Sequence, residues 1–364
     1  MAQRAIERQQ EQFVEDVLGA IDGAFTVFGL YLGDQLGFYD ALADAASLIP
    51  GELATRTDTD ERYAREWLEQ QTVAGVLEVD DETRPAADRR FRLPDGHVEP
   101  LTGEDSLEYV VPLAQLVAGA VAPLHDVLDA YRTGEGVPYG AYGRDLREGQ
   151  ARINRSSFLR LLGSEWVPVM DDVHERLGGG DPPARVADVG CGAGYSCIGL
   201  AREYPTVEID GFDLDEASVE LARRNVSAAG LEDRVRIHHQ DASDADLDGD
   251  YDLVLALECV HDMSDPVGAL ATMRRLAGED GAVLVVDERV GESFTAEGND
   301  VEWMMYGWSI LHCLPVGMAD QPSAATGTVM RPATLESYAA DAGFDGVEVL
   351  PVENVFFRFY RLDP

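Results

Sequence analysis

The stretch Arg185-Val-Ala-Asp-Val-Gly-Cys-Gly-Ala-Gly194 decides the fold of this chain. The part up to Val189 is a short apolar segment of the kind that forms buried strands. Glycines in a GxGxG spacing follow, and a helical pattern over Tyr195–Tyr204 begins directly after them. Glycines at such a turn adopt positive φ and let the backbone come close to a ligand. We therefore predict a strand, a ligand-binding turn and a helix here.

The same alternation of strand and helix continues beyond this loop. Apolar segments alternate with helical patterns and with turn residues such as Gly230. Repeated strand–helix units with apolar strands indicate a parallel, doubly wound α/β sheet of Rossmann-like type. The expected strands cover 185–189, 207–212, 235–239, 251–257 and 282–287, the expected helices cover 195–204, 216–229 and 266–277, and 347–352 and 355–362 form a terminal antiparallel pair.

Acidic residues stand at the ends of the expected strands, where open α/β sheets bind their ligands. Asp188 lies inside the glycine turn, where a carboxylate repels a pyrophosphate but attracts a sulfonium or ammonium group. Asp213 follows the second strand and is placed to accept hydrogen bonds from ribose hydroxyls. Asp241 follows the third strand, where it can accept from an adenine amino group, and Glu258 follows the fourth. Dinucleotide sites use GxGxxG, so these features disfavour a nicotinamide-dependent oxidoreductase.

The glycine loop and these acids together resemble the class I S-adenosylmethionine-dependent methyltransferases over about residues 185–362. The resemblance implies a seven-stranded sheet, S-adenosyl-L-methionine as the cofactor, methyl transfer as the reaction and no metal ion. It also implies roles for the residues of the site. By this resemblance Gly190, Gly192 and Gly194 hold the methionine part, Asp213 the ribose, Asp241 and Ala242 the adenine, and Glu258 lines the methionine and substrate side. Leu214, next to Asp213, is a further expected cofactor contact.

Two assignments in this cofactor site stay open. Asp215 competes with Asp213 as the ribose ligand, although an acid placed just before the helix at 216–229 is also a good helix cap. Asp188 either contacts the cofactor or holds the loop by hydrogen bonds.

The N-terminal zone has the pattern of a winged helix. Short helical segments from Phe25 onward include Asp60–Ala74, which Gly75 ends, and a polar hairpin follows. The stretch Tyr63-Ala-Arg-Glu-Trp-Leu-Glu-Gln-Gln-Thr-Val-Ala-Gly-Val-Leu-Glu78 resembles the winged-helix domain that precedes the catalytic domain in many small-molecule O-methyltransferases. The resemblance implies a homodimer formed through this domain. We expect a winged-helix-like domain at 1–100, a helical connector at 101–177 and a methyltransferase domain at 178–364.

A winged helix also occurs in DNA-binding regulators, so a methyltransferase-like transcriptional regulator is the alternative function. DNA binding requires Lys and Arg side chains against the phosphates. The expected third helix carries Arg62 and Arg65 among four acids, and only Arg89, Arg90 and Arg92 form a basic cluster. We therefore expect no nucleic-acid partner.

The acceptor side of the site has two candidate bases, because a hydroxyl acceptor gains from losing its proton to a group such as histidine. His312 is the first candidate. It lies in the insertion at 290–331, which is rich in aromatic residues and methionine and is long for a connection in a compact domain. His261 is the second candidate, with a structural role in its loop as the alternative.

A third possibility is an enzyme that uses no base and relies on holding the two reactants together. The strand end Asp287-Glu288-Arg289 faces the same rim and is placed to orient a polar substrate. We expect a small-molecule acceptor that is methylated at oxygen more readily than at nitrogen or carbon.

Charge and composition exclude several classes of protein. The formal net charge is −40, from 68 acidic and 28 basic residues, and every basic residue is Arg. The absence of Lys excludes a Walker-type phosphate loop and Schiff-base catalysis. An acidic excess spread along the whole chain is typical of a halophilic protein, because high salt screens the repulsion between like charges.

The remaining features indicate a cytoplasmic protein. We find neither a signal-peptide pattern at the N-terminal end nor an apolar segment long enough to span a membrane. The four cysteines lack CxxC spacing and are expected to be reduced thiols. Cys259 with His261, and His312 with Cys313, are conceivable metal ligands, but buried apolar thiols beside unrelated histidines are the preferred interpretation.

Overall fold

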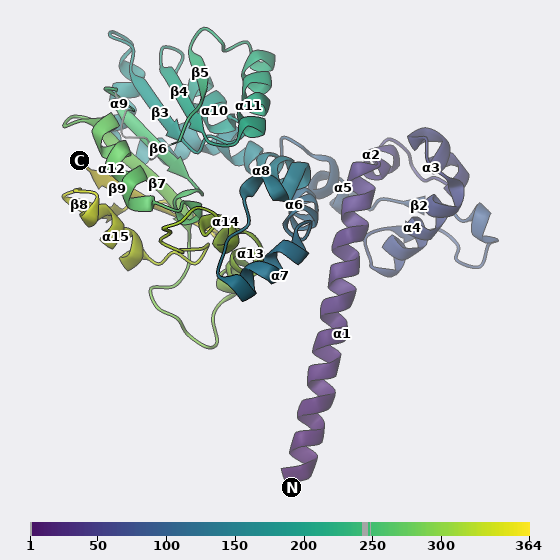
Figure 1. The fold of residues 1–364 in the computed structure, drawn as a ribbon. Helices are drawn as coiled ribbons and strands as arrows, with labels where there is room; N and C mark the ends of the chain where they lie inside the picture. Colours follow the sequence, from purple (N-terminus) through teal and green to yellow (C-terminus); the bar gives the residue numbers. More distant parts are fainter. Residues whose placement is uncertain (1, 242–246, 248) are drawn as a thin grey trace. The chain divides into compact units, whose positions relative to one another are not determined.

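The computed structural model describes residues 2–241, 247 and 249–364, so Ala242 lies outside the described residues. Contacts within the chain divide it into two compact units, Met1–Ala118 and Gly119–Pro364. Figure 1 shows the helices and strands of both units, which are described separately below.

The first unit is mostly helical, with one small hairpin. The hairpin strands pair antiparallel, with Glu78 opposite Arg92 and Val79 opposite Phe91. The helices of this unit pack around Phe38, Leu53 and Leu68, which are almost completely buried. Its elements are α1 (Ala2–Gln35), α2 (Phe38–Ala43), α3 (Pro50–Thr57), α4 (Glu61–Val73), β1 (Glu78–Val79), β2 (Phe91–Arg92) and α5 (Asp95–Thr102), and α6 (Pro112–Ala120) crosses the boundary between the units.

Helix α4 begins and ends where the sequence predicts. The Asp60 side chain caps it by accepting hydrogen bonds from the backbone N–H groups of Arg62 and Tyr63. Gly75 follows the helix with φ of 78°, in the left-handed region that favours glycine. The buried Trp67 donates a hydrogen bond from Nε1 to the Gly29 carbonyl, which fixes α4 against α1.

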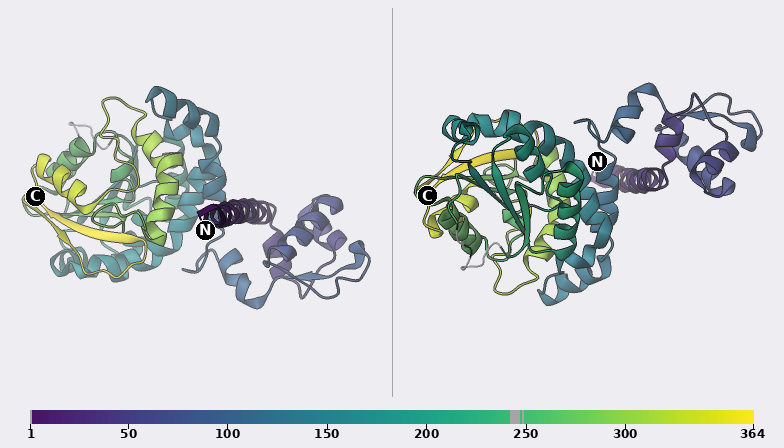
Figure 2. Two further views of the ribbon diagram at one scale, coloured as in Figure 1. Left: turned by 90° about the horizontal axis from the view of Figure 1, so that it is seen from below. Right: turned by 90° about the horizontal axis from the view of Figure 1, so that it is seen from above.

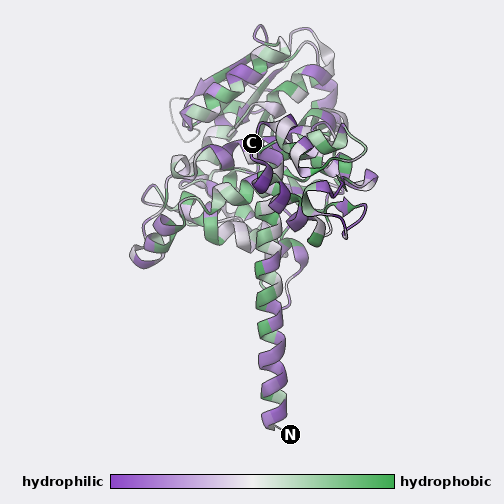
Figure 3. Ribbon diagram, turned by 90° about the vertical axis from the view of Figure 1, so that its right-hand side faces the viewer, coloured by the Kyte–Doolittle hydropathy of each residue, from purple (hydrophilic) through white to green (hydrophobic). Residues whose placement is uncertain are grey.

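Helix α1 is much longer than the segment that the sequence analysis expected. The expected helix began at Phe25, whereas α1 begins at Ala2 and has 34 residues. Its first half is polar and carries a narrow apolar stripe, so it lacks the broad apolar face by which a core-packed helix is recognised. Figure 3 shows hydrophobic residues interleaved with hydrophilic ones along this helix. The exposed members of the stripe are Ile6, Phe13, Val14, Val17, Leu18, Ile21, Phe25, Phe28 and Leu32.

The second unit contains the doubly wound sheet that the sequence predicts. Its strand order is β5-β4-β3-β6-β7-β9-β8, with a parallel block from β5 to β7 and antiparallel pairing of β9 with both β7 and β8. The strand order reverses between β3 and β6, which places the ligand crevice at their carboxyl ends. The strands are β3 (Arg185–Val189), β4 (Glu208–Asp213), β5 (Val235–His239), β6 (Leu253–Leu257), β7 (Ala282–Glu288), β8 (Gly346–Val349) and β9 (Phe357–Asp363).

Helices cover both faces of this sheet, as Figure 2 shows from two directions. One apolar core includes Val186 of β3 and Leu200 of α10, and a second includes Val189 of β3 and Leu270 of α12. Strand β3 is buried on both faces, which explains its continuous apolar sequence. The helices on the two faces are α9 (Asp171–Gly179), α10 (Tyr195–Glu203) and α11 (Glu216–Ala229) on one, and α12 (Pro266–Ala277) and α15 (Pro332–Asp341) on the other.

Further helical segments of the second unit precede the sheet or lie between β7 and α15. From Gly119 onward, the residues expected as a separate connector are grouped with the sheet. Two of the segments are π-helical, a form that often occurs near functional sites. The segments are α7 (Leu124–Thr133), η2 (Tyr139–Tyr142), α8 (Gly143–Ser157), the π-helix η3 (Phe158–Trp166), η4 (Val167–Val169), α13 (Asp300–Trp308), the π-helix η6 (Ser309–Cys313) and α14 (Leu314–Gly317).

Candidate active site

The glycine loop joins β3 to α10 and needs its glycines for two different reasons. Gly190, Gly192 and Gly194 have φ of 72°, 51° and 77°, values that side-chain-bearing residues rarely adopt. A Cβ atom added to Gly190 would lie 2.8 Å from the Cys259 sulfur, so packing also excludes a side chain there. A Cβ added to Gly192 would meet no described atom within 4 Å. The loop is therefore open at Gly192, where a ligand can approach the backbone.

Asp188 supports the loop from within the protein. It is 1% exposed, and its carboxylate accepts hydrogen bonds from the Ser196 hydroxyl and, at 3.2 Å, from the Cys197 thiol. Burial is the largest cause that raises the pKa of Asp188 to about 6. These contacts, both with Oδ2, favour the alternative in which Asp188 holds the loop and the start of α10.

Asp213, at the end of β4, lies directly beside the loop. Its two carboxylate oxygens accept from the backbone N–H groups of Gly192 at 2.8 Å and of Asp215 at 2.9 Å. Burial raises the pKa of the Asp213 carboxyl, and these two backbone hydrogen bonds oppose the rise. Each oxygen retains a lone pair for a further donor.

Asp215 caps helix α11, which is one of the two roles expected for it from the sequence. Its side chain accepts from the backbone N–H of Ser218 at 2.8 Å, which caps α11. It also forms an ion pair with Arg147 of α8 at 2.6 Å. With both oxygens engaged in these bonds, Asp215 is the weaker candidate for a ribose ligand.

The remaining expected cofactor contacts are less enclosed. Leu214 is 60% exposed, an unusual state for a leucine. Asp241 is exposed at the end of the β5 region, and its partner in the prediction, Ala242, lies outside the described residues. Leu214 therefore offers an apolar surface beside Asp213, while the geometry of the adenine end remains a prediction.

His261 is fixed in one orientation by a carboxylate. It lies in the short helix η5 (Val260–Asp262) after β6 and is 2% exposed. Its Nδ1 lies 2.9 and 3.1 Å from the two oxygens of Asp287, the penultimate residue of β7. Its Nε2 lies 3.2 Å from an Asp262 oxygen, in an ion-pair contact. Burial alone would lower the pKa of His261, but the surrounding carboxylates raise it well above 6.5.

Glu258 combines a strained backbone with a buried carboxyl group. Its φ is 55°, in the left-handed region that costs a side-chain-bearing residue about 1–3 kcal/mol. Burial is the largest cause that raises the pKa of Glu258 to about 7, and a hydrogen bond from the Asn154 side chain opposes the rise. Strain of this kind persists where the surrounding structure holds it and is common at active sites. Glu258 lies with His261 and Asp287 at the carboxyl ends of β6 and β7, as expected.

His312, the first candidate base of the sequence analysis, has a different environment. It is 5% exposed in the π-helix η6, with its ring edge-to-face against Tyr142 at 4.6 Å between centroids. Burial lowers the pKa of His312. Its Nδ1 lies 3.5 Å from the Cys313 sulfur, and its Nε2 has no hydrogen-bond partner among the described residues. Within the described part of the chain, no carboxylate orients this ring in the way that Asp287 orients His261.

Two groups of side chains in this region are close enough to hold a metal ion. The groups are His261 with Asp262 and Cys313, and His261 with Asp287 and Glu288. The His261 imidazole lies 2.9 Å from the Asp287 carboxylate, so the two groups form a direct hydrogen bond with no space for an ion between them. The expectation of a metal-free site therefore stays a prediction.

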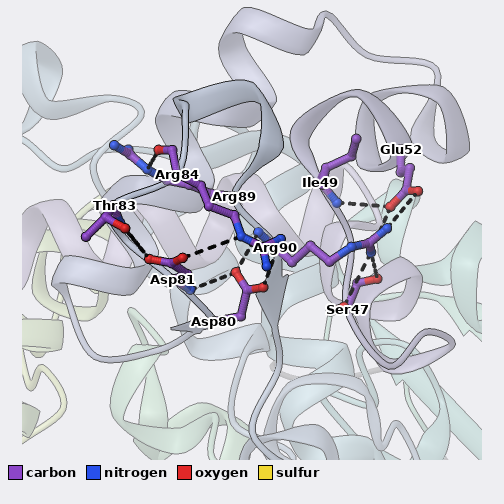
Figure 4. A network of polar contacts seen from close by, with 9 residues as sticks. All are labelled: Ser47, Ile49, Glu52, Asp80, Asp81, Thr83, Arg84, Arg89 and Arg90. Carbon is purple, nitrogen blue, oxygen red and sulfur yellow. Dashed lines mark hydrogen bonds and ion pairs between the residues drawn. The ribbon is translucent and has the colours of Figure 1, made fainter.

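The basic cluster of the first unit is neutralised by its neighbours, as Figure 4 shows for Arg90. Arg90 donates to both carboxylate oxygens of Glu52 at 3.2 Å and to the Ser47 carbonyl at 3.0 Å. Arg89 pairs with Glu69 at 2.6 Å, and Arg92 pairs with Glu78. Arginines that are paired with acids in this way are poorly suited to bind DNA phosphates.

Family comparisons agree with this division of the chain. A family profile described as a methyltransferase domain matches residues 181–316. The chain carries a methyltransferase domain. A second profile, described as an Rv2258c-like winged HTH domain, matches residues 24–103 in the first unit. The methyltransferase domain thus contains the glycine loop, the strand-end acids and both candidate histidines, and a winged-helix domain precedes it.

Individual relatives match this chain over short segments. Ajmaline N-methyltransferase of Rauvolfia serpentina is 28% identical over 136 residues, which are 36% of this chain and 44% of the relative. The tRNA1(Val) (adenine(37)-N6)-methyltransferase of Yersinia pestis is 40% identical over 82 residues, or 22% of this chain and 28% of the relative. The chain thus spans less than half the length of these curated relatives.

Solved structures match over almost the whole chain but at low identity. Mitomycin 7-O-methyltransferase has a TM-score of 0.68 and 18% identity, covering 98% of this chain and 99% of that one. The human N-acetylserotonin methyltransferase, solved with S-adenosylmethionine, has a TM-score of 0.63 and 18% identity, covering 98% and 97%. At this identity the likeness shows a shared fold, in which a helical N-terminal region precedes a methyltransferase domain.

Several residues near the site come from the helices before the sheet, where the sequence contains no recognisable motif. Arg147 and Asn154 of α8 contact Asp215 and Glu258 respectively. Tyr139 lies near Asp213. Burial is the largest cause that raises the pKa of the Tyr139 hydroxyl, and the negative charge of Asp213 raises it further. The sequence offers only helical periodicity here, so the structure was needed to find them.

Proposed function

We propose that this protein transfers a methyl group from S-adenosyl-L-methionine to a hydroxyl group of a small molecule. The observation that carries the proposal is the histidine–carboxylate pair of His261 and Asp287, which lies at the same sheet edge as the open glycine loop. O-methyltransferases among the structural neighbours support the choice of oxygen, while the curated N-methyltransferase relatives make nitrogen the competing acceptor atom.

Residues of the loop and of β4 fit the cofactor. The open side of Gly192 lets the backbone approach a ligand, Asp213 keeps lone pairs for ribose hydroxyls, and Leu214 presents an exposed apolar side chain to a base. When bound, S-adenosylmethionine supplies a methyl group that its sulfonium has already activated. The strongly acidic site favours such a cation. Asp241 and Ala242 remain our proposed adenine contacts.

His261, rather than His312, is the base in this proposal, which reverses the order given by the sequence analysis. Asp287 holds Nδ1, so Nε2 is the atom that would take the hydroxyl proton from the acceptor. Asp287 also stabilises the imidazolium that results. His312 lacks such a carboxylate, and we propose that it lines the acceptor pocket together with Tyr142.

Calorimetry tests the cofactor and the reaction class. We expect S-adenosylhomocysteine to bind and NAD to give no heat of binding. An acceptor screen with tritiated S-adenosylmethionine would then identify the methylated atom. Binding of NAD without a response to either adenosyl compound would refute the proposal and favour an oxidoreductase.

The first unit is proposed to form a homodimer and not to read DNA. The stripe on α1 exposes several large apolar side chains, with Phe13 68% and Leu18 56% exposed, and exposed apolar patches mark interaction sites. The paired arginines of the hairpin argue against phosphate binding. Sequence-selective gel shifts with genomic DNA at high salt would instead support the regulator.

A halophilic, cytoplasmic setting is proposed from the charge of the chain. No helix among the described residues is long and apolar enough to cross a membrane. With a formal net charge of −40, self-repulsion should destabilise the fold at low ionic strength. We expect the thermal midpoint to rise steeply between roughly 0.1 and 1 M KCl, as the screening length falls from about 10 to 3 Å. A flat response would contradict the halophilic proposal.

A further inference from the structure

The site contains more negative charge than its own residues can balance. Carboxylates surround the single imidazole of His261 on several sides, and a protonated His261 balances only one of them. Buried charges without a partner carry a large free-energy cost. The surrounding carboxylates are those of Glu258, Asp262, Asp287 and Glu288. The arrangement therefore requires added protons or a bound cation.

Three of these carboxylates each have an oxygen with no hydrogen-bond partner among the described residues. One is Asp262, whose Oδ1 has an ion-pair contact with the Nε2 atom of His261 at 3.2 Å. The other two are Glu258 and Glu288. Glu288 is 7% exposed, and its Oε2 lies 3.6 Å from the Nδ1 atom of His261, which is already engaged by Asp287. Glu258 receives a hydrogen bond from Asn154, yet its Oε1 is buried and unpartnered. Buried polar atoms are almost always satisfied, so these two oxygens point to an absent ligand.

The chemistry of the missing partner follows from the two oxygens. Burial is the largest cause that raises the pKa of both carboxyl groups, so the partner must bind their ionised forms in place of added protons. An ionised carboxylate only accepts hydrogen bonds, so the partner must donate them. The Glu258 N–H donates to the Val286 carbonyl at 2.8 Å, which joins the ends of β6 and β7. The negative charge of Glu258 also contributes, after burial, to the raised pKa of Glu288, so the two side chains lie near each other. An ammonium group carries three donors and a positive charge, and therefore matches two adjacent carboxylates. The sulfonium of the cofactor has no N–H or O–H and cannot provide these bonds.

Resting on the proposed methyl transfer, we propose that the acceptor carries a protonated amino group that binds between Glu258 and Glu288, apart from the hydroxyl that is methylated. The hydroxyl then lies toward the Nε2 atom of His261, and the amino group toward β7. Asn154 orients Glu258 for this contact. The competing partner for Glu258 is the ammonium of the cofactor's methionine, which the sequence analysis placed on this side.

The experiment uses two probes of nearly equal shape in the complex with S-adenosylhomocysteine. Tyramine carries a phenol and an ammonium, whereas 4-propylphenol replaces the ammonium by a methyl group. Titration calorimetry at neutral pH, where an alkylamine is protonated, compares their affinities. Because hydrogen bonds to charged groups contribute about 1.5–3 kcal/mol, we expect tyramine to bind at least tenfold more tightly.

The variants Glu288→Gln and Glu258→Gln keep the shape of each side chain and remove its charge. We expect each to reduce the preference for tyramine to roughly threefold or less, since each removes one charged acceptor. Glu288→Gln should leave the affinity for S-adenosylhomocysteine within about twofold of wild type. Glu292→Gln, at an exposed position, is the control for the change in net charge and should alter neither affinity.

Several results would overturn the inference. They are equal binding of the two probes, no measurable tyramine binding, or a tyramine preference that survives both substitutions. Loss of S-adenosylhomocysteine affinity in Glu258→Gln with an unchanged tyramine preference would assign Glu258 to the cofactor and also refute it. If S-adenosylhomocysteine fails to bind the wild-type protein, this result refutes the proposed function, and the inference that rests on it is refuted as well.

Discussion

The substitution Asp188→Asn alters the charge of the glycine loop without altering its size. In the folded protein burial holds the pKa of Asp188 at about 6, against 3.8 for an unperturbed carboxyl. Between these two values the unfolded chain releases a proton that the folded chain keeps. The free energy of unfolding therefore falls as the pH rises through this window. Below the window the group carries no penalty, and above it the full penalty persists without further change with pH.

The size of the effect follows from the gap between the two pKa values. Each unit is worth about 1.4 kcal/mol, so the full penalty on the folded state is about 3 kcal/mol at neutral pH. Asparagine does not titrate and escapes this penalty. The protein is least soluble near its sequence pI of about 4.3, so only the upper part of the window is practical. From pH 5 to pH 7 we expect the stability of Asp188→Asn relative to wild type to rise by about 1.4 kcal/mol.

Urea unfolding in high KCl, followed by tryptophan fluorescence, measures this difference. Trp166 is 3% exposed in the second unit and reports on its unfolding. Asp172→Asn is the control, because Arg361 lowers the pKa of Asp172 and the group stays ionised in both states across the range. Its stability relative to wild type should not change from pH 5 to pH 7. A relative stability of Asp188→Asn that is equally flat would refute the reasoning that burial makes this carboxyl costly to ionise.

Four further predictions concern binding, catalysis and assembly. Asp213→Ala should weaken binding of S-adenosylhomocysteine by at least about tenfold in calorimetry, because it removes a proposed charged acceptor; an unchanged affinity would exclude Asp213 as the ribose ligand. His261→Asn should lower kcat by about 10²- to 10⁴-fold with cofactor affinity retained, and His312→Ala should reduce it far less; the opposite order would restore the ranking of the sequence analysis. Because the raised pKa of His261 keeps the imidazole protonated at pH 6.5, kcat/KM should increase as the pH rises above that value, whereas a pH-independent rate would favour catalysis without a base. Val17→Asp with Leu18→Asp on α1 should convert the proposed dimer to monomers in sedimentation velocity, while monomeric wild-type protein would remove this interface from consideration.

Much of the fold could be predicted because the relevant signals are local. Strand β3, helix α11 and helix α12 lie at their expected residues, since apolar runs, a capping acid or proline, and a closing glycine define each of them. The first half of α1 escaped prediction because its narrow apolar stripe faces solvent in this chain. We propose that this stripe packs against a partner surface, which the local sequence does not reveal.

Some of the proposed site residues could likewise be predicted from the local sequence, whereas others depend on contacts between distant parts of the chain. Asp213 and Glu258 follow strands and were found from their positions at strand ends. Our proposal ranks His261 above His312 because of its contact with Asp287, which lies 26 residues further along the chain and could not be predicted from the local sequence. Asn154 belongs to a helix with no chemical motif, and only tertiary packing brings it to Glu258.

The left-handed backbone of Glu258 lowers the stability of the folded protein at a position that we propose serves substrate binding. Glycine at position 258 would relieve the strained φ and remove a buried carboxyl from the core, so Glu258→Gly should give a more heat-resistant chain. A library selected for thermal tolerance alone would therefore drift to glycine at this position and lose the acceptor site. Parallel selection for turnover would retain glutamate, and the divergence of the two populations would measure how much stability the chain gives up for its chemistry.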